Sequence, residues 1–292
     1  MILHQAIRYG EELLRDAGIA DAQWNAERLL LKTLGIGRAE VYANLQRELT
    51  DVQGSAYRAL LVRRAQHEPL AYIEGTQEFY GREFHVDRSV LIPRPETEEV
   101  VRAALALTLP AKPGILDLGA GSGCIAATLA LEIRGARVTA LELSRAAIRV
   151  LRSNSHGEVK IVRGDLFSPP FLPASFDLLV SNPPYVEEKD YESLPAETRH
   201  EPREALVPAS LKAVFLSLLQ TAKLFLKPGG FMIFEIGAGQ DSVVDELLKK
   251  QTGISKIGSR SDFRGILRTF ILQNTCTSSM ISSSRSNETQ SS

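Results

Sequence analysis

Apolar residues recur at helical spacing through the first part of the chain. Ala6, Leu13, Leu14 and Ala17 show this spacing, and residues 24–34 and 51–67 continue it. Side chains three or four positions apart lie on one face of a helix, and such a face is buried against neighbouring helices. The pattern predicts a small helical domain over residues 1–75.

The periodicity changes after Glu68. Short apolar runs around Phe79, Phe84 and Leu91 are bounded by Gly75 and Gly81, and they end at Pro93. Short apolar runs bounded by glycine and proline are typical of hairpin strands. We predict a β-hairpin linker over residues 76–95.

From residue 96 onward, apolar runs of strand length alternate with helical patterns. Alternation of this kind predicts an α/β fold with a mostly parallel sheet that is covered by helices on both faces. We expect this domain to span residues 96–274 and a serine-rich disordered tail to occupy residues 275–292. Strands are predicted at residues 114–118, 137–141, 160–163, 178–181 and 231–236, and helices at residues 125–132, 144–153 and 211–226.

Composition narrows the class of protein. A chain of 292 residues, 44% hydrophobic, is long enough for about two domains. The net charge of -1 and pI near 6.6 provide no general attraction to nucleic acid, so we expect no stable nucleic-acid binding. No apolar run approaches the roughly 20 residues that span a bilayer, so no membrane association is expected.

Cysteine and histidine usage argues against metal and disulfide chemistry. Cys124 and Cys276 are the two cysteines of the chain, so neither a disulfide framework nor a cysteine zinc site is available. The five histidines show no paired metal spacing, and we assign no metal. These features favour a reducing cytoplasm.

A glycine-rich loop follows the first predicted strand of the α/β domain. Strand, glycines and helix in this order form the place where an open α/β sheet holds a nucleotide-like ligand. A dinucleotide site has the spacing Gly-x-Gly-x-x-Gly, but Cys124 occupies the third glycine position here, which disfavours NAD. Glu142 ends the second strand, where an acidic side chain can bind both hydroxyls of a ribose. The loop consists of Gly119, Ala120, Gly121, Ser122 and Gly123.

A proline-rich turn follows the apolar strand at residues 176–180. Two prolines fix the backbone and remove two donors, so the turn carbonyls and the asparagine amide oxygen remain available as acceptors. Acceptors in a rigid turn suit a substrate NH2 group, although Asn-Pro also begins ordinary turns. The turn consists of Asn182, Pro183, Pro184 and Tyr185.

Together, the glycine loop and Glu142 resemble the Rossmann-like class I S-adenosylmethionine-dependent methyltransferases. In that superfamily the loop binds the methionyl part of the cofactor and the acid binds the ribose. Asp165 and Leu166 follow the third strand, where the superfamily contacts adenine. Asp165 is expected to accept from the adenine amine and Leu166 to cover the ring. The alternative for this pair is a capping aspartate followed by a core residue.

Longer motifs at residues 68–75, 78–81 and 91–98, joined to the Asn-Pro-Pro-Tyr turn, resemble the peptide chain release factor glutamine methyltransferases over residues 1–272. The resemblance implies methyl transfer from S-adenosyl-L-methionine to the side-chain amide of the glutamine in the Gly-Gly-Gln motif of class 1 release factors. We expect the helical domain to dock the release factor, because it carries no chemistry-bearing cluster, and Asn182 to contact cofactor as well as substrate. Catalytic roles are implied for Asn182, Pro183 and Tyr185, and a role in glutamine binding for the whole turn including Pro184.

Two other functions use the same motifs. An amino-methyltransferase acting on adenine, cytosine or guanine in DNA or RNA would also use an Asn-Pro-Pro-Tyr turn, but the balanced charge and the lack of a large target-recognition domain oppose it. The other is a catalytically silent S-adenosylmethionine-binding or ribosome-associated protein, which the intact glycine loop, Glu142 and Asn182 oppose. Arg94 is left open between substrate contact and a structural ion pair, and Glu235 between catalysis and structure.

Overall fold

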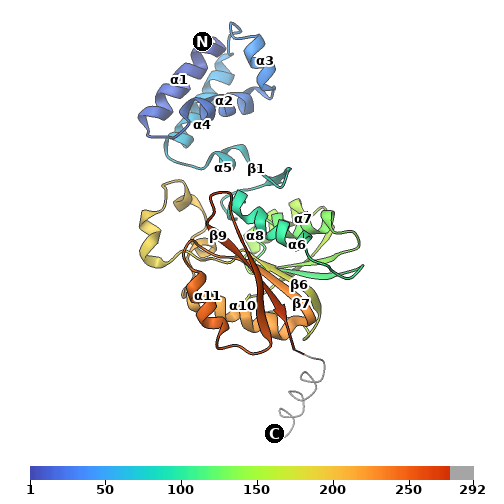
Figure 1. Cartoon of the computed structure of the whole chain (residues 1–292). Coiled ribbons are helices and arrows are strands. Elements are labelled where there is room, and N and C mark those ends of the chain that lie inside the picture. The colour runs from blue at the N-terminus through green and yellow to red at the C-terminus, as the bar shows by residue number, and fades with distance from the viewer. Residues whose placement is uncertain (277–292) are drawn as a thin grey trace. The chain divides into compact units, whose positions relative to one another are not determined.

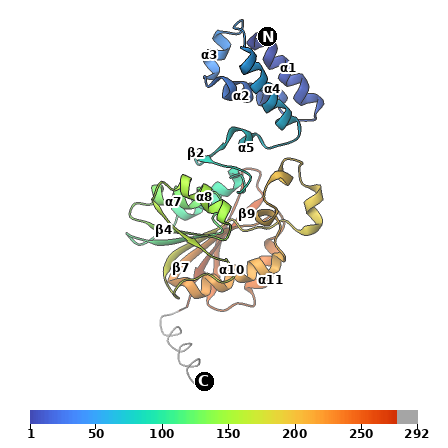
Figure 2. The ribbon, with the colours of Figure 1, turned by 180° about the vertical axis from the view of Figure 1, so that it is seen from behind.

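A computed structural model describes residues 1–276, and the chain forms two units (Figures 1 and 2). The helical unit comprises Met1–Gln77 together with the short segment Leu194–His200. The sheet unit comprises Glu78–Ser193 and the chain from Glu201 onward. The helical unit is therefore discontinuous in sequence.

Tight packing of amphipathic helices forms the helical unit. The Tyr57 hydroxyl lies 3.2 Å from the carbonyl oxygens of both Ala6 and Ala26, so the buried phenol has acceptors on two helices. A Cβ atom at Gly10 would meet this hydroxyl at 2.2 Å, so glycine permits the close approach. The α-helices are α1 (Leu3–Asp16), α2 (Ala22–Leu34), α3 (Arg38–Ala43), α4 (Asp51–Ala65) and α5 (Leu70–Glu74).

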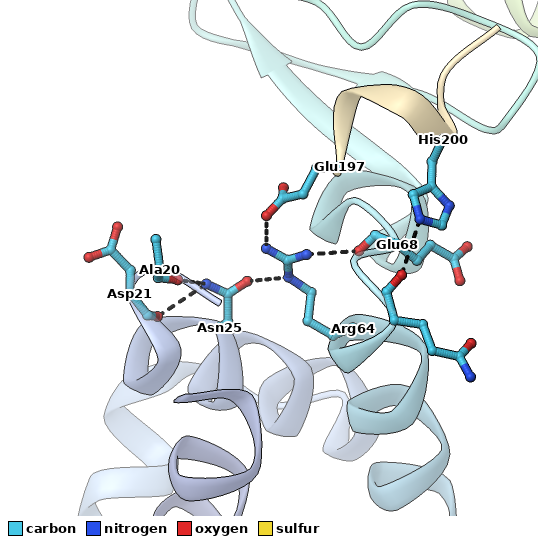
Figure 3. A network of polar contacts seen from close by, with 8 residues as sticks. Ala20, Asp21, Asn25, Arg64, Glu68, Glu197 and His200 are labelled. Carbon is cyan, nitrogen blue, oxygen red and sulfur yellow. Dashed lines mark hydrogen bonds and ion pairs between the residues drawn. The ribbon is translucent and has the colours of Figure 1, made fainter. Parts of the chain in front are cut away.

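A buried arginine connects the short segment to the rest of the helical unit (Figure 3). The Arg64 side chain is only 4% exposed and forms an ion pair with Glu197. Its Nε donates to Asn25 Oδ1 at 2.8 Å, and its Nη1 donates to the Glu68 carbonyl oxygen at 3.1 Å. Each polar edge of this guanidinium thus has an acceptor, as burial of a charge requires.

The predicted β-hairpin is present where the chain passes from the first unit to the second, as β1 (Thr76–Phe79) and β2 (Arg82–His85). Its turn residues Tyr80 and Gly81 both have positive φ, at 52° and 69°. Positive φ at both central residues is characteristic of a two-residue type I′ turn, whose twist matches that of the two hairpin strands. The hairpin is shorter than the apolar pattern suggested, because residues 86–94 form no strand.

In the sheet unit, the predicted parallel sheet is confirmed. Within the described residues its strand order is β5-β4-β3-β6-β7-β9-β8, with the pairs from β5 to β7 parallel and β9 antiparallel to its neighbours. The strands are β3 (Gly114–Leu118), β4 (Arg137–Glu142), β5 (Val159–Arg163), β6 (Phe176–Ser181), β7 (Leu226–Glu235), β8 (Ile254–Ser261) and β9 (Leu267–Asn274). The helices are η1 (Pro95–Thr97), α6 (Glu98–Leu105), α7 (Cys124–Glu132), α8 (Arg145–Asn154), η2 (Glu188–Ser193), α9 (Arg203–Leu206), α10 (Leu211–Phe225) and α11 (Asp241–Leu248), while η3 (Thr198–His200) lies in the helical unit.

Alternate strand residues form two cores. Ile115 and Leu178 pack with α6 and α7, whereas Leu116 and Leu179 pack with α10 and α11 on the other face. The chain runs outward from β3 to β5 and then returns to β6 on the other side of β3. Such a reversal opens a crevice beyond the carboxyl ends of the central strands.

The predicted disordered tail, residues 275–292, lies outside the described residues apart from residues 275 and 276. Within residues 1–276, no helix combines the length and the apolar character needed to cross a membrane.

Candidate active site

A cavity of about 540 Å³ lies in the sheet unit at the crevice beyond the carboxyl ends of β3, β4 and β6. Clefts of this size hold small-molecule ligands and cofactors. Three residues predicted for the site do not line the cavity: Gly123, Pro183 and Tyr185. The predicted residues that do line it are Gly119, Ala120, Gly121, Ser122, Glu142, Asp165, Leu166, Asn182 and Pro184.

The glycine loop owes its spacing to backbone conformation. Gly119, Gly121 and Gly123 have φ values of 70°, 55° and 81°, which side chains disfavour. A Cβ at Gly119 or Gly121 would meet no protein atom within 4 Å, whereas at Gly123 it would meet Leu151 at 3.1 Å. The first two glycines therefore leave open space above the loop, and the third permits packing beneath it.

Glu142 is nearly buried and is fixed by two backbone donors. Its Oε2 accepts from the Gly121 amide and its Oε1 from the Ser144 amide, each at 2.8 Å. Each carboxylate oxygen keeps a further lone pair that can accept a hydrogen bond. The side chain thus orders the glycine loop and still presents acceptors to the cavity.

Asp165 and Leu166 reach the cavity together with two apolar side chains that the sequence did not single out. Asp165 Oδ1 accepts from the Phe167 amide at 2.9 Å, which fixes the carboxylate. Phe167 and Leu143 line the cavity, and they are 53% and 55% exposed. Exposed large apolar side chains beside a cavity suit a flat ring, and adjacency to Asp165 and Glu142 was the sequence signal that could have identified them.

Asn182 presents an unsatisfied acceptor. Its Nδ2 donates to Thr97 Oγ1 at 3.0 Å, while its Oδ1 is buried and has no hydrogen-bond partner among the described residues. Asn182, Thr97 and Pro184 line the cavity. A buried acceptor left unpaired costs about 1 to 3 kcal/mol, so this oxygen favours a ligand that donates to it.

Tyr185 and Thr97 converge on a buried carboxylate. The Tyr185 hydroxyl donates to Glu235 Oε1 at 2.8 Å, and Thr97 Oγ1 donates to Glu235 Oε2 at 2.6 Å. Burial raises the pKa of Glu235, and the two hydrogen bonds oppose that rise. Burial, followed by the charge of Glu235, raises the pKa of the Tyr185 phenol. Glu235 does not line the cavity, and Thr97 links it to Asn182.

Asp117 is a buried carboxylate at the foot of the glycine loop that the sequence analysis did not select. Its Oδ2 accepts from the Ala126 amide at 3.1 Å in the first turn of α7, and its Oδ1 has no partner in the described part of the chain. Burial raises the pKa of Asp117 to about 7.

Arg94, which the sequence left open, forms an ion pair with Glu201. The Glu201 side chain is 1% exposed, and it also accepts from the Ile92 amide at 3.0 Å. This arrangement anchors Glu201, which comes two residues before α9.

Comparison with known proteins gives matches over most of the chain. A family model described as the PrmC N-terminal domain matches residues 5–75, and one described as the methyltransferase small domain matches residues 101–209. The release factor glutamine methyltransferase of Geobacter sulfurreducens is 41% identical over 87% of this chain and 90% of its own length. The protein of the same name from Chlorobaculum tepidum is 42% identical over 79% of this chain and 83% of its own length. The solved structure of TrmN from Thermus thermophilus is 18% identical, with a TM-score of 0.47, over 84% of this chain and 77% of that chain.

Proposed function

The chain belongs to the release factor glutamine methyltransferases, and from this premise we propose that it methylates the side-chain amide nitrogen of the glutamine in the Gly-Gly-Gln motif of class 1 release factors. Asn182 carries the proposal. Its buried Oδ1 lacks a partner within residues 1–276, and a glutamine NH2 group would supply the missing donor. The relatives are named for release factors, so a DNA or RNA substrate is not favoured.

The residues around the cavity fit S-adenosyl-L-methionine. Open space above Gly119 and Gly121 allows the methionyl part to approach the backbone, and Glu142 would bind the ribose hydroxyls. Asp165 would accept from the adenine amine, while Leu166 and Phe167 would cover the ring. When bound, the cofactor supplies an electrophilic methyl group on a positively charged sulfur.

In the proposed reaction the protein orients a weak nucleophile. The lone pair of an amide nitrogen is delocalised, so the two N–H bonds must be held for the lone pair to face the methyl group. Asn182 Oδ1 and the Pro183 carbonyl oxygen would accept these two hydrogens. As positive charge grows on nitrogen, both hydrogen bonds strengthen and stabilise the transition state. The methylated nitrogen, now positively charged, is acidic enough to release one proton to water without a strong base.

We assign release factor docking to the helical unit. Trp24, Tyr9 and Tyr42 of this unit are 53%, 40% and 43% exposed. Aromatic side chains are enriched in protein interfaces, which supports this assignment. We place the enzyme in the cytoplasm, because both cysteines are free and its substrate acts in translation.

Mass spectrometry tests the proposed function. The purified chain is incubated with a release factor and isotopically labelled S-adenosylmethionine, and tryptic peptides are analysed. We expect one methyl group on the glutamine of the Gly-Gly-Gln peptide, and none when that glutamine is replaced by asparagine. Labelled adenine or cytosine in added RNA or DNA, with an unlabelled release factor, would overturn the proposal.

A further inference from the structure

Asn182 is oriented from behind by a chain of hydrogen bonds. Glu235 accepts from the Thr97 hydroxyl through one carboxylate oxygen and from the Tyr185 hydroxyl through the other, at 2.6 and 2.8 Å. Both contacts are donated by the hydroxyls, so each hydroxyl uses its single proton in its contact with Glu235. The Thr97 oxygen then has lone pairs available but no proton for a further hydrogen bond.

This count of protons determines which way the asparagine amide faces. Asn182 Nδ2 lies 3.0 Å from Thr97 Oγ1. An amide NH2 can donate to an oxygen that has only lone pairs to offer, whereas an amide oxygen there would face another acceptor. The Thr97 contact therefore selects the orientation that leaves Asn182 Oδ1 as the free acceptor, and both residues line the cavity.

We propose that Thr97 and Glu235 are positioning residues for methyl transfer: Glu235 fixes the Thr97 proton, and Thr97 fixes the Asn182 amide with its oxygen toward the substrate nitrogen. The inference rests on the proposed role of Asn182 as the acceptor for the glutamine amide. With the amide turned over, its NH2 group would face the substrate NH2 group. Two donors would then oppose each other, and the nucleophile would lose its orientation.

Full-length variants separate this role from simple packing. Thr97→Val has nearly the shape of threonine but lacks the hydroxyl, Thr97→Ser keeps the hydroxyl, and Glu235→Gln replaces one acceptor oxygen with a donor. Thr128→Val is the matched control, because Thr128 is fully buried in the same unit and its hydroxyl has no partner among residues 1–276. The measurements are kcat and KM for the release factor and the calorimetric Kd for S-adenosylmethionine.

We expect Thr97→Val and Glu235→Gln to lower kcat roughly 10- to 100-fold, with KM and cofactor Kd within about threefold of wild type. Thr97→Ser and Thr128→Val should keep kcat within about threefold. A loss confined to kcat and rescued by serine is not expected from general destabilisation.

Wild-type kcat in Thr97→Val would overturn the inference, as would an equal loss in Thr97→Ser or Thr128→Val. If Thr97→Val does not fold, Glu235→Gln decides alone, and wild-type kcat in that variant overturns the inference. Failure of the proposed function has a different signature, because wild-type enzyme would then leave the release factor glutamine unmethylated.

Discussion

At the scale of single residues, the site depends on acceptors that are held by other hydrogen bonds. Glu142 accepts from two backbone amides, and Asn182 is held through its nitrogen by Thr97. A side chain fixed in this way loses little conformational freedom when a ligand arrives. Cofactor binding and turnover should therefore respond separately to changes at these two residues.

Glu142→Ala is expected to weaken cofactor binding by roughly 2 to 4 kcal/mol. The substitution removes the proposed ribose acceptor and also frees the Gly121 amide, which the carboxylate orders. Calorimetric titration with S-adenosylmethionine measures the effect, and Glu158→Ala, at an exposed position, is the control. Unchanged affinity in Glu142→Ala would remove this residue from the site.

Asn182→Ala is expected to lower turnover by roughly 10² to 10³ while cofactor affinity stays near wild type. The reason is that the hydrogen bond to the substrate nitrogen strengthens as charge develops in the transition state. Asn182→Asp keeps an acceptor but adds charge and removes the donor to Thr97. Single-turnover kinetics tests both variants, and Asn44→Ala, at an exposed position, should turn over normally. Normal turnover in Asn182→Ala would contradict the mechanism.

Asp117 should make the stability of the cofactor-free protein depend on pH. Because the folded-state pKa is about 7 and the ordinary value is 3.8, the folded state binds the proton more tightly than the unfolded state. The unfolding free energy therefore rises as pH falls from about 7 toward 4, and above pH 7 the buried charge costs on the order of a few kcal/mol. Asp117→Asn should be more stable than wild type at pH 8, and the difference should shrink by pH 5. Thermal melts across this range measure the effect, and a variant less stable at pH 8 would refute it.

At the scale of elements, strand and helix periodicity predicted most of the sheet unit but not its last two strands. β8 is an edge strand with mostly exposed residues, so it lacks the apolar run that indicates a buried strand. β9 runs antiparallel between β7 and β8, outside the alternation of strands and helices. The glycine loop could be predicted from the sequence, because three of its positions adopt positive φ values that favour glycine. The contacts of Thr97 with Asn182 and Glu235 join residues far apart in sequence, and no local pattern encodes them.

Exposed aromatic residues on the helices of the N-terminal region should contribute to release factor binding. We expect Trp24→Ala to raise KM for the intact release factor about tenfold, since buried aromatic anchors typically contribute 1 to 2 kcal/mol or more. KM for a short Gly-Gly-Gln peptide should not change, because the peptide lacks the rest of the release factor that would contact Trp24. Val52→Ala removes an apolar side chain that is 80% exposed in the same unit and is the control. An equal rise in KM for protein and peptide would argue against docking through Trp24.

At the scale of the whole molecule, the unexpected feature is the discontinuity of the helical unit. Composition and periodicity indicated two domains in sequence order, but no apolar pattern in residues 194–200 shows that this segment joins the helices. Its attachment includes the pair of Arg64 and Glu197, 133 positions apart, and the contact of His200 Nε2 with the Gln66 carbonyl oxygen at 3.1 Å. Pairings of this kind depend on the folded arrangement and cannot be read from local sequence.

Arg64→Ala should loosen this segment. The substitution removes the ion pair to Glu197 and leaves Asn25 Oδ1 without its arginine donor, while the sheet unit keeps its own core. Limited trypsin digestion should then cut faster at Arg199, with the fragments identified by mass spectrometry. Arg58→Ala is the control, because Arg58 is exposed and donates a long hydrogen bond, at 3.5 Å, to Ser55. Equal cleavage rates in both variants would show that Arg64 does not hold the segment.

The discontinuous unit also limits how recombination can reshape this enzyme. A crossover near residue 77 would exchange the N-terminal helices for those of a relative but keep the original residues 194–200. The imported counterpart of Arg64 would then meet a Glu197 segment from another lineage. Viable hybrids should therefore inherit both pieces from one parent, so that these two stretches are transmitted as a single heritable module despite their distance along the gene.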